Sequence, residues 1–138
     1  MKDFTQNAKG LDFGAGTGPV ISKILKDNGF NIKLFDPFFH NYPFLLETKY
    51  NYIAACEVIE HFHHPKKEFA LLKKLLLKNG KLYCQTNLYD ESIDFHTWHY
   101  KSDNTHVFFY HNKTIHWIKD EFGFSEVVIK DRLITFCN

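Results

Sequence analysis

A glycine-rich segment preceded by an acidic residue is the first part of the sequence with a clear chemical use. The segment reads Leu11-Asp12-Phe13-Gly14-Ala15-Gly16-Thr17-Gly18 and separates a strand-like run from a helix-like one. Glycine lets a backbone turn tightly and come close to a ligand, and the helix that follows offers unpaired N–H groups. The spacing is GxGxG, whereas dinucleotide-binding loops have GxGxxG. The pattern predicts a ligand-binding loop, and a tight turn without a ligand is the alternative.

The charge of Asp12 indicates which class of ligand suits this loop. A carboxylate there attracts the ammonium group of a cofactor that carries an amino acid, but it repels a pyrophosphate. A nicotinamide dinucleotide therefore fits the loop less well. An oxidoreductase that uses such a cofactor is kept as an alternative, which titration of NADH would test.

A second acidic residue, Asp36, ends the strand-like run 31–35, at the edge where doubly wound folds bind their ligands. An ionised carboxylate only accepts hydrogen bonds, so it suits the two hydroxyl donors of a ribose. Pro37 and Phe38, together with Phe35, would give an apolar wall for an adenine ring. A turn carboxylate before proline is the alternative for Asp36.

A cluster of acidic residues and histidines follows the apolar run 52–56. It contains Glu57, Glu60 and His61, and two more histidines precede Pro65. Acidic residues at a helix start can simply be solvated there, where they suit the helix dipole. Glu57 and His61 would share a helix face, but Pro65 follows shortly and no spacing matches a ligand pattern such as H-E-x-x-H. We therefore expect no metal site.

The segments around these residues alternate between strand-like and helix-like patterns. We predict strands at 10–13, 31–35, 52–56, 81–86, 125–129 and 133–137. Helices are predicted at 19–27, at 65–77 and from a cap at Asn112 to Gly123. The last two strands are too close for a crossover, so they must pair antiparallel through a tight turn at Asp131. This order predicts an α/β three-layer sandwich over residues 1–138 as one domain, with a doubly wound, mostly parallel sheet that ends in an antiparallel hairpin.

Four of these segments closely resemble, in order, the motifs of class I S-adenosylmethionine (SAM) dependent methyltransferases. They are LDFGAGTG, LFDPF, YIAACEVIEHFHHP and KNGKLYCQTNL. The resemblance is strongest to bacterial small-molecule methyltransferases with an EVIEH-type segment, and it extends over residues 10–137. The later run from Trp98 to Phe109 is similar to their D-x-T-H-x-x-F-F segment. The resemblance implies a Rossmann-like fold, SAM as cofactor, S-adenosyl-L-homocysteine as product and a small molecule as methyl acceptor.

The resemblance also implies a role for each matching residue. The methionine part of SAM would lie against Asp12, Phe13, Gly14, Ala15, Gly16, Thr17 and Gly18. The ribose and adenine would lie against Asp36, Pro37 and Phe38, and the sulfonium beside Glu57 and Val58. Cys56 would be a further cofactor contact. The family places another adenine contact after its third strand, which is degenerate here within 42–47 and gives no assignable residue.

Methyl transfer from a sulfonium is an in-line displacement, in which the protein supplies alignment and a dry pocket. A general base is needed only when the acceptor must lose a proton. The matching segment makes His106 the first candidate for a base or substrate ligand, and His61 is the second. Ordering of its own loop is the alternative role for His106. Further candidates for the acceptor pocket are Tyr100, Asp103, Phe108 and Phe109.

Composition narrows the range of partners. The net charge is +1 with neutral histidines, and Arg132 is the only arginine, so the chain has no basic field for a nucleic acid. No apolar run is long enough to span a bilayer. The three cysteines have no paired spacing, as expected for reduced thiols in a cytoplasmic protein. A small-molecule acceptor is left by elimination.

Members of the family usually carry one or two helices before their first strand, where they form part of a lid. Only nine residues precede Gly10 here. We therefore expect a more open site, or one that a second copy or a partner chain covers. The alternative from another functional class is a SAM-fold binding module without turnover, whose mark would be SAM affinity without methyl transfer.

Overall fold

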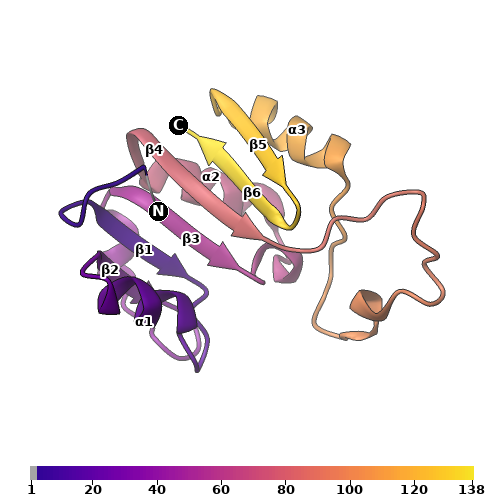
Figure 1. Ribbon diagram of the computed structural model, residues 1–138, viewed down its shortest axis with the longest axis horizontal. Coiled ribbons are helices and arrows are strands. Elements are labelled where there is room, and N and C mark those ends of the chain that lie inside the picture. Colours follow the sequence, from indigo (N-terminus) through magenta and orange to yellow (C-terminus); the bar gives the residue numbers. More distant parts are fainter. Residues whose placement is uncertain (1–2) are drawn as a thin grey trace.

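Six strands form one mixed sheet in the computed structural model, which describes residues 3–138 (Figure 1). The strands are β1 Lys9–Phe13, β2 Asn31–Phe35, β3 Tyr50–Cys56, β4 Leu76–Gln85, β5 Glu126–Lys130 and β6 Leu133–Cys137. Their order across the sheet is β2-β1-β3-β4-β6-β5. The helices are α1 Val20–Asp27, α2 Pro65–Leu75 and α3 Asn112–Glu121, and the 3-10 turns are η1 Pro43–Glu47, η2 Ile59–His61 and η3 His99–Ser102.

The direction of the strands confirms the predicted doubly wound sheet with a terminal hairpin. The strands β2, β1, β3 and β4 are parallel to one another, and β6 is antiparallel to both β4 and β5. Asp131 makes the turn between β5 and β6 with a φ of 53°, a conformation that short polar residues tolerate. The chain thus has the Rossmann-like α/β arrangement expected from its sequence.

Parallel pairing brings the ends of three strands to one edge of the sheet. Phe13 at the end of β1 is in register with Phe35 at the end of β2, and β3 lies on the other side of β1. The glycine loop (residues 14–18), Asp36 and the segment 57–61 therefore all begin at this edge. This convergence is what positions the site.

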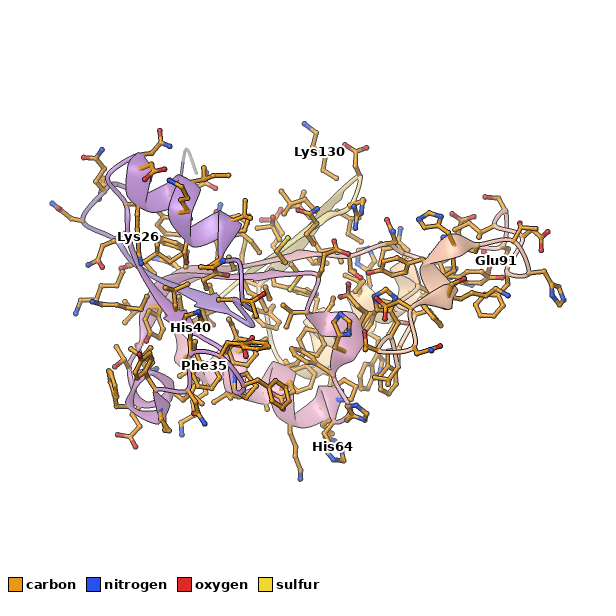
Figure 2. The ribbon with its side chains drawn as sticks, turned by 90° about the horizontal axis from the view of Figure 1, so that it is seen from below. Lys26, Phe35, His40, His64, Glu91 and Lys130 are labelled. Carbon is orange, nitrogen blue, oxygen red and sulfur yellow. The ribbon has the colours of Figure 1, made fainter. Side chains whose placement is uncertain are left out.

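Helices cover both faces of the sheet. Figure 2 shows α1 on one face and α2 on the opposite face. The main core lies between the sheet and the helices α2 and α3, and its fully buried side chains include Ile53, Leu72, Leu82, Ile115 and Phe136. A much smaller cluster of Ala8, Ile32 and Tyr52 lies on the other face, against Leu25 of α1.

The apolar stripe predicted for α1 is only partly covered. Val20 and Ile24 are 63% and 53% exposed, whereas the polar Ser22 is the fully buried residue of this helix. The helix lies near the β2 end of the sheet (Figure 1). The helix thus packs on the sheet through Leu25 and turns the Ser22 hydroxyl toward Asp12 of β1.

The helix predicted over 65–77 ends at Leu75. Leu76 pairs with Tyr50 and begins β4, so this strand starts well before residue 81. The ladder then shifts its register, and Asn79 takes a left-handed φ of 61° at the irregularity. Pairing with β3 therefore overrides the helical pattern at residues 76 and 77.

The prediction of a degenerate third strand within 42–47 is wrong, because residues 43–47 form the turn η1. Pro43 lacks the N–H group that a strand ladder needs, and its fixed φ suits the first turn of a helix. Leu45 is buried, and its carbonyl oxygen accepts a hydrogen bond from the Tyr50 hydroxyl at 2.8 Å. This contact fixes η1 against the start of β3.

The cap of α3 is His111 rather than the predicted Asn112. The N–H of Lys113 donates to His111 Nδ1 at 3.1 Å. Gly123 follows the helix with a left-handed φ of 65°, which agrees with the predicted end. None of the helices within residues 3–138 is long and apolar enough to cross a membrane.

The long segment 86–111 between β4 and α3 projects beyond the edge of the sheet (Figure 1). Glu91 marks its far end in Figure 2. Aromatic rings pack along the segment, and the Trp98 centroid lies 5.3 Å from those of both Tyr100 and Phe109. These contacts give the segment a small apolar centre of its own.

Candidate functional site

The glycine loop is anchored to the end of the neighbouring strand. The N–H groups of Gly14 and Ala15 donate to the carbonyl oxygen of Phe35 at 2.8 and 3.2 Å. The N–H of Gly16 donates to Asp36 Oδ2 at 2.9 Å. Gly14 and Gly16 have left-handed φ angles of 76° and 61°, which favour glycine. The shape of the loop is therefore held by β2.

The space around the glycines differs along the loop. A Cβ on Gly14 would lie 2.6 Å from Val58 Cγ2, so this glycine lets the loop touch the segment that follows β3. A Cβ on Gly16 or on Gly18 would meet no described atom within 4 Å. The middle and end of the loop thus border open space, which a closely bound ligand would fill.

Asp12 lies beneath the loop and is only 3% exposed. Its Oδ2 accepts hydrogen bonds from the N–H of Ser22 at 3.2 Å and from the Ser22 hydroxyl at 2.7 Å. Burial raises the pKa of the Asp12 carboxyl, and the hydrogen bonds from Ser22 act in the opposite direction. Asp12 therefore joins β1 to α1 and places a carboxyl group below the loop.

Replacing Asp12 with asparagine is expected to preserve the fold, because the amide oxygen still accepts both hydrogen bonds from Ser22. The raised pKa means that the folded chain binds the proton of the Asp12 carboxyl more tightly than the unfolded chain does. The wild type therefore loses stability as the pH rises from the pKa of the unfolded chain through the higher pKa of the folded chain. The variant lacks this loss. The free energy of unfolding of the variant should lie within about 1 kcal/mol of that of the wild type near pH 4. As the pH rises toward about 7, the variant should become more stable relative to the wild type.

Urea unfolding at a series of pH values measures the difference between Asp12→Asn and the wild type. Asp27→Asn is the matched control, because Asp27 is an exposed carboxylate on α1. A difference that stays constant with pH would show that the Asp12 carboxyl titrates alike in the folded and unfolded chain.

Asp36 directly follows β2 as a buried carboxylate with three hydrogen bonds from the backbone. Besides the N–H of Gly16, those of Phe38 and Phe39 donate to its Oδ1 at 2.8 and 3.0 Å. A carboxylate has about four lone-pair sites, so Oδ2 keeps one of them for a further donor. The arrangement accommodates one ribose hydroxyl directly, rather than the two expected from the sequence.

A cleft of about 590 Å³ opens beside the loop and Asp36, and Phe35 and His64 mark its surroundings in Figure 2. The predicted site residues on its wall are Phe13, Gly14, Asp36, Pro37, Phe38, Glu57, Val58 and His61. The wall also contains residues that were not predicted as contacts, namely Leu46, Phe62, His63, His64, Glu68 and Leu71. Leu71 could have been predicted as a contact, because it is an apolar residue of the helix predicted at 65–77. No pattern singled out Leu46, because η1 was expected to be a strand.

Several predicted contacts are not part of this wall. They are Asp12, Ala15, Gly16, Thr17, Gly18, Cys56, Tyr100, Asp103 and His106. Of these, Gly16 and Gly18 border open space, and Asp12 is hydrogen-bonded to Ser22 of α1. Cys56 instead faces a separate cavity of about 250 Å³ on the α1 side of the sheet, with its Sγ 3.6 Å from Gln85 Oε1. Side chains of a strand alternate between its faces, so the side chain of Cys56, predicted as a cofactor contact, points away from the cleft.

Glu57 is held at the start of the segment after β3 by its backbone and by two side chains. Its φ is 52°, and its N–H donates to the Gln85 carbonyl oxygen at 2.9 Å. Arg132 Nη2 donates to Oε1 at 2.5 Å, and the Tyr100 hydroxyl donates to Oε2 at 3.2 Å. Burial, and then the negative charge of Glu60, raises the pKa of Glu57. Arg132 was not predicted at the site, and the hairpin turn brings it there.

The two predicted histidines lie together but at different depths. Their ring centroids are 4.8 Å apart, and His61 lines the cleft. The side chain of His106 is only 7% exposed and does not line the cleft, so its role as a base or substrate ligand stays a prediction. The Nδ1 atoms of His61 and His106 lie 2.9 and 2.8 Å from the carbonyl oxygens of Thr105 and Tyr100. These contacts leave Nε2 of each ring for other partners.

Tyr100 and Asp103, which were predicted as acceptor contacts, hold the segment 86–111 in place. The buried Tyr100 hydroxyl is within hydrogen-bond distance of Glu60 Oε1 and lies 2.9 Å from Thr86 Oγ1. Burial raises the pKa of Tyr100. Asp103 accepts a hydrogen bond from the N–H of Thr105 at 2.9 Å, and the hydrogen bonds from Thr105 lower its pKa. Both side chains therefore order the segment next to the cleft.

Comparison with known families identifies this arrangement. The sequence model of the methyltransferase domain family matches residues 2–128. The chain belongs to this family. The comparison with curated proteins found no match for this chain.

Solved structures share the fold of this methyltransferase domain. A SAM dependent methyltransferase from Archaeoglobus fulgidus is 16% identical with a TM-score of 0.71, and the match covers 92% of this chain and 66% of that one. Human N-acetylserotonin methyltransferase in complex with SAM is 13% identical with a TM-score of 0.73, over 95% of this chain and 47% of the human protein. Haemonchus contortus phosphoethanolamine N-methyltransferase 2, also with SAM, is 16% identical with a TM-score of 0.65, over 92% and 35%. The chain thus spans 66% or less of the length of these three proteins.

Proposed function

We propose that this chain binds SAM in the cleft and transfers its methyl group to a small-molecule acceptor, leaving S-adenosyl-L-homocysteine. The observation that carries the proposal is the open space over Gly16 and Gly18, next to the buried carboxylate of Asp36 and at the edge where three parallel strands end. Two of the proteins with the same fold were solved in complex with SAM. Membership of the methyltransferase domain family supports the same reaction.

The residues present fit the parts of SAM. The ammonium of its methionine part is attracted by Asp12 below the glycine loop, and one ribose hydroxyl can donate to Asp36 Oδ2. A nicotinamide dinucleotide fits less well, because Asp12 would face its pyrophosphate. The apolar wall that suits an adenine consists of Phe35, Pro37, Phe38, Leu46 and Leu71.

SAM supplies an electrophilic methyl group on a sulfonium, which an acceptor atom displaces in line. The contribution of this chain is alignment and exclusion of water from the cleft. Glu57 and His61 reach the cleft from one short segment, and the negative charge of Glu57 suits a nearby sulfonium. When Nδ1 of His61 carries the proton that faces Thr105 O, its Nε2 is free to act as a base or as a metal ligand.

A small molecule is the acceptor class that suits the charge of the chain. The net charge of +1 supplies no field that would hold a nucleic acid. Two proteins of the same fold are named for the small molecules N-acetylserotonin and phosphoethanolamine. The part of the wall not assigned to the adenine has Val58 and Phe62 beside Glu57, Glu68 and histidines, which suits an acceptor that is partly polar.

Isothermal titration calorimetry with SAM and with S-adenosyl-L-homocysteine tests the proposal. The wild type is expected to bind both compounds, and Asp36→Ala is expected to bind them about 30-fold more weakly or worse. The variant loses the ribose contact and leaves three backbone N–H groups without their acceptor, a change of about 2 kcal/mol or more. Asp36→Asn keeps an acceptor oxygen and should weaken binding less, and Asp27→Ala on the exposed side of α1 should bind as the wild type does.

Three outcomes separate the alternatives. Equal SAM affinity in the wild type and in Asp36→Ala, with both folded by circular dichroism, would refute the SAM site. SAM binding without a methylated product from phenols, amines and carboxylic acids would identify a binding module without turnover. Saturable NADH fluorescence on titration, without SAM binding, would favour an oxidoreductase.

A further inference from the structure

Three residues that could ligate a metal ion meet behind the wall of the cleft. Glu60 and His61 come from η2, and His106 comes from the segment 86–111. Each offers one ligand atom, and these atoms all lie within 4.8 Å of one another. The two segments are also joined through the backbone, because the N–H groups of Val107 and Phe108 donate to the Glu60 carbonyl oxygen at 2.9 and 3.1 Å. The cluster is therefore built into the packing of the chain.

Both histidines are oriented as metal-binding histidines usually are. In such sites one ring nitrogen donates to a backbone carbonyl or a carboxylate, which fixes the tautomer and leaves the other nitrogen unprotonated. His61 Nδ1 lies 2.9 Å from Thr105 O, and His106 Nδ1 lies 2.8 Å from Tyr100 O. The Nε2 atoms of the two rings therefore remain for a metal, and that of His106 lies 3.8 Å from Asp103 Oδ2, beyond hydrogen-bond distance.

Glu60 supplies an independent sign that a cation is needed. Its side chain is fully buried, and its Oε2 has no hydrogen-bond partner within residues 3–138. The single hydroxyl proton of Tyr100 is shared between Glu60 Oε1 and Glu57 Oε2, and Arg132 reaches only Glu57. A buried carboxyl oxygen without a hydrogen-bond partner is unfavourable, and a cation at Oε2 would supply the missing partner.

We propose that Glu60, His61 and His106 bind a divalent first-row transition metal such as Zn²⁺ or Mn²⁺. Two imidazoles and one carboxylate suit these ions, whereas Mg²⁺ and Ca²⁺ prefer oxygen ligands. Metal–ligand bonds of about 2.0–2.2 Å place ligand atoms roughly 3–3.5 Å apart, so the three side chains close on the ion by about 1 Å. The two histidines then act as ligands rather than as bases.

The three protein ligands leave coordination positions open. Because His61 lines the cleft, one open position faces the proposed acceptor site, where the metal can polarise an acceptor oxygen. This part of the inference rests on the proposed methyl transfer, whereas metal binding itself does not. It also replaces the expectation, based on spacing along the chain, that no metal is bound.

The metal site is tested by titrating metal into the protein after EDTA treatment and removal of any purification tag. Calorimetry with ZnCl₂ and MnCl₂ should give one equivalent bound in the wild type, and MgCl₂ should bind at least about tenfold more weakly. Glu60→Gln and His106→Ala should each weaken Zn²⁺ binding at least about tenfold. His99→Ala is the matched control, because His99 is exposed in the same segment, and it should bind as the wild type does.

Thermal unfolding gives a second measurement that distinguishes a ligand from a structural residue. In EDTA, Glu60→Gln should melt close to the wild type, because the amide oxygen still accepts the hydrogen bond from Tyr100 and the second side-chain atom lacks a partner in both proteins. Saturating Zn²⁺ should raise the melting temperature of the wild type and not that of the variant. A residue with a purely structural role would melt lower in both conditions.

The proposal is overturned if the EDTA-treated wild type binds neither metal, or if Glu60→Gln and His106→Ala both bind Zn²⁺ as tightly as the wild type. His106→Ala decides the question even if Glu60→Gln fails to fold. Calorimetry with SAM keeps this result separate from the proposed function. Loss of SAM binding in Asp36→Ala with intact Zn²⁺ binding supports both, whereas absence of SAM binding in a wild type that binds Zn²⁺ would refute the SAM site and leave the metal site standing.

Discussion

Substitution of Gly14 by alanine is expected to lower the free energy of unfolding by about 2–5 kcal/mol and to abolish SAM binding. Gly14 has a φ of 76°, and a side chain in the left-handed region costs about 1–2 kcal/mol. The new Cβ would also lie 2.6 Å from Val58 Cγ2, and overpacking of this kind costs about 1–3 kcal/mol. Val58 belongs to the segment that carries Glu57 and His61, so the displacement reaches the site. Urea unfolding and calorimetry with SAM measure the two effects.

Gly18→Val is the matched variant that separates the ligand from the fold. Gly18 is not in the left-handed region, and its Cβ would meet no described atom within 4 Å. Its stability should therefore change by less than about 0.5 kcal/mol. The added side chain fills the open space beside the loop, so SAM affinity should fall about tenfold or more. A folded Gly18→Val variant with wild-type affinity would show that SAM does not lie over this end of the loop.

The convergence of the glycine loop, Asp36 and the segment 57–61 could be predicted because it follows from local patterns. When a helix lies between two consecutive strands, it forms a crossover connection, and strands joined by such a crossover are parallel. Parallel strands end at the same edge of a sheet. The terminal hairpin followed in the same way from the short separation of its strands, and the pairing of Lys130 with Leu133 confirms it.

The element boundaries that were wrong depend on partners far away in the sequence. Residues 76 and 77 continue the apolar pattern of α2, and only the pairing of Leu76 with Tyr50 makes them part of a strand. The apolar residues of η1 suited a strand equally well. The missing N–H of Pro43 and the hydrogen bond from the Tyr50 hydroxyl to Leu45 decide for a turn.

The surroundings of Glu60 could not be predicted, because a long segment with little regular structure creates them. Motif spacing relates only residues a few positions apart in the sequence. It therefore cannot predict that His106 lies close to Glu60. The contact arises when the segment 86–111 folds back and two of its N–H groups reach the Glu60 carbonyl oxygen. The hairpin turn brings Arg132 to Glu57 in a similar way. Thus the cofactor side of the site is encoded locally, and its other side depends on tertiary packing.

The core beneath this site gives the largest expected effect on stability. Phe69 of α2 is 1% exposed, and replacing it with alanine should lower the free energy of unfolding by about 3–5 kcal/mol. Its ring centroid lies 5.8 Å from that of Phe62 and 6.2 Å from that of Tyr110, whose hydroxyl donates to Ile59 O at 2.9 Å. Because Ile59 begins η2, loss of this ring should also weaken metal and SAM binding.

Thermal unfolding should show a fall of about 10–20 °C for Phe69→Ala and a smaller one for Phe69→Leu, which keeps part of the buried volume. Phe38→Ala is the matched control, because Phe38 is 85% exposed and should change stability by less than about 0.5 kcal/mol. A Phe69→Ala variant as stable as Phe38→Ala would mean that α2 does not pack on the sheet through this ring. The site would then need another support for η2, since the contacts of Phe62 and Tyr110 with Phe69 link η2 to α2.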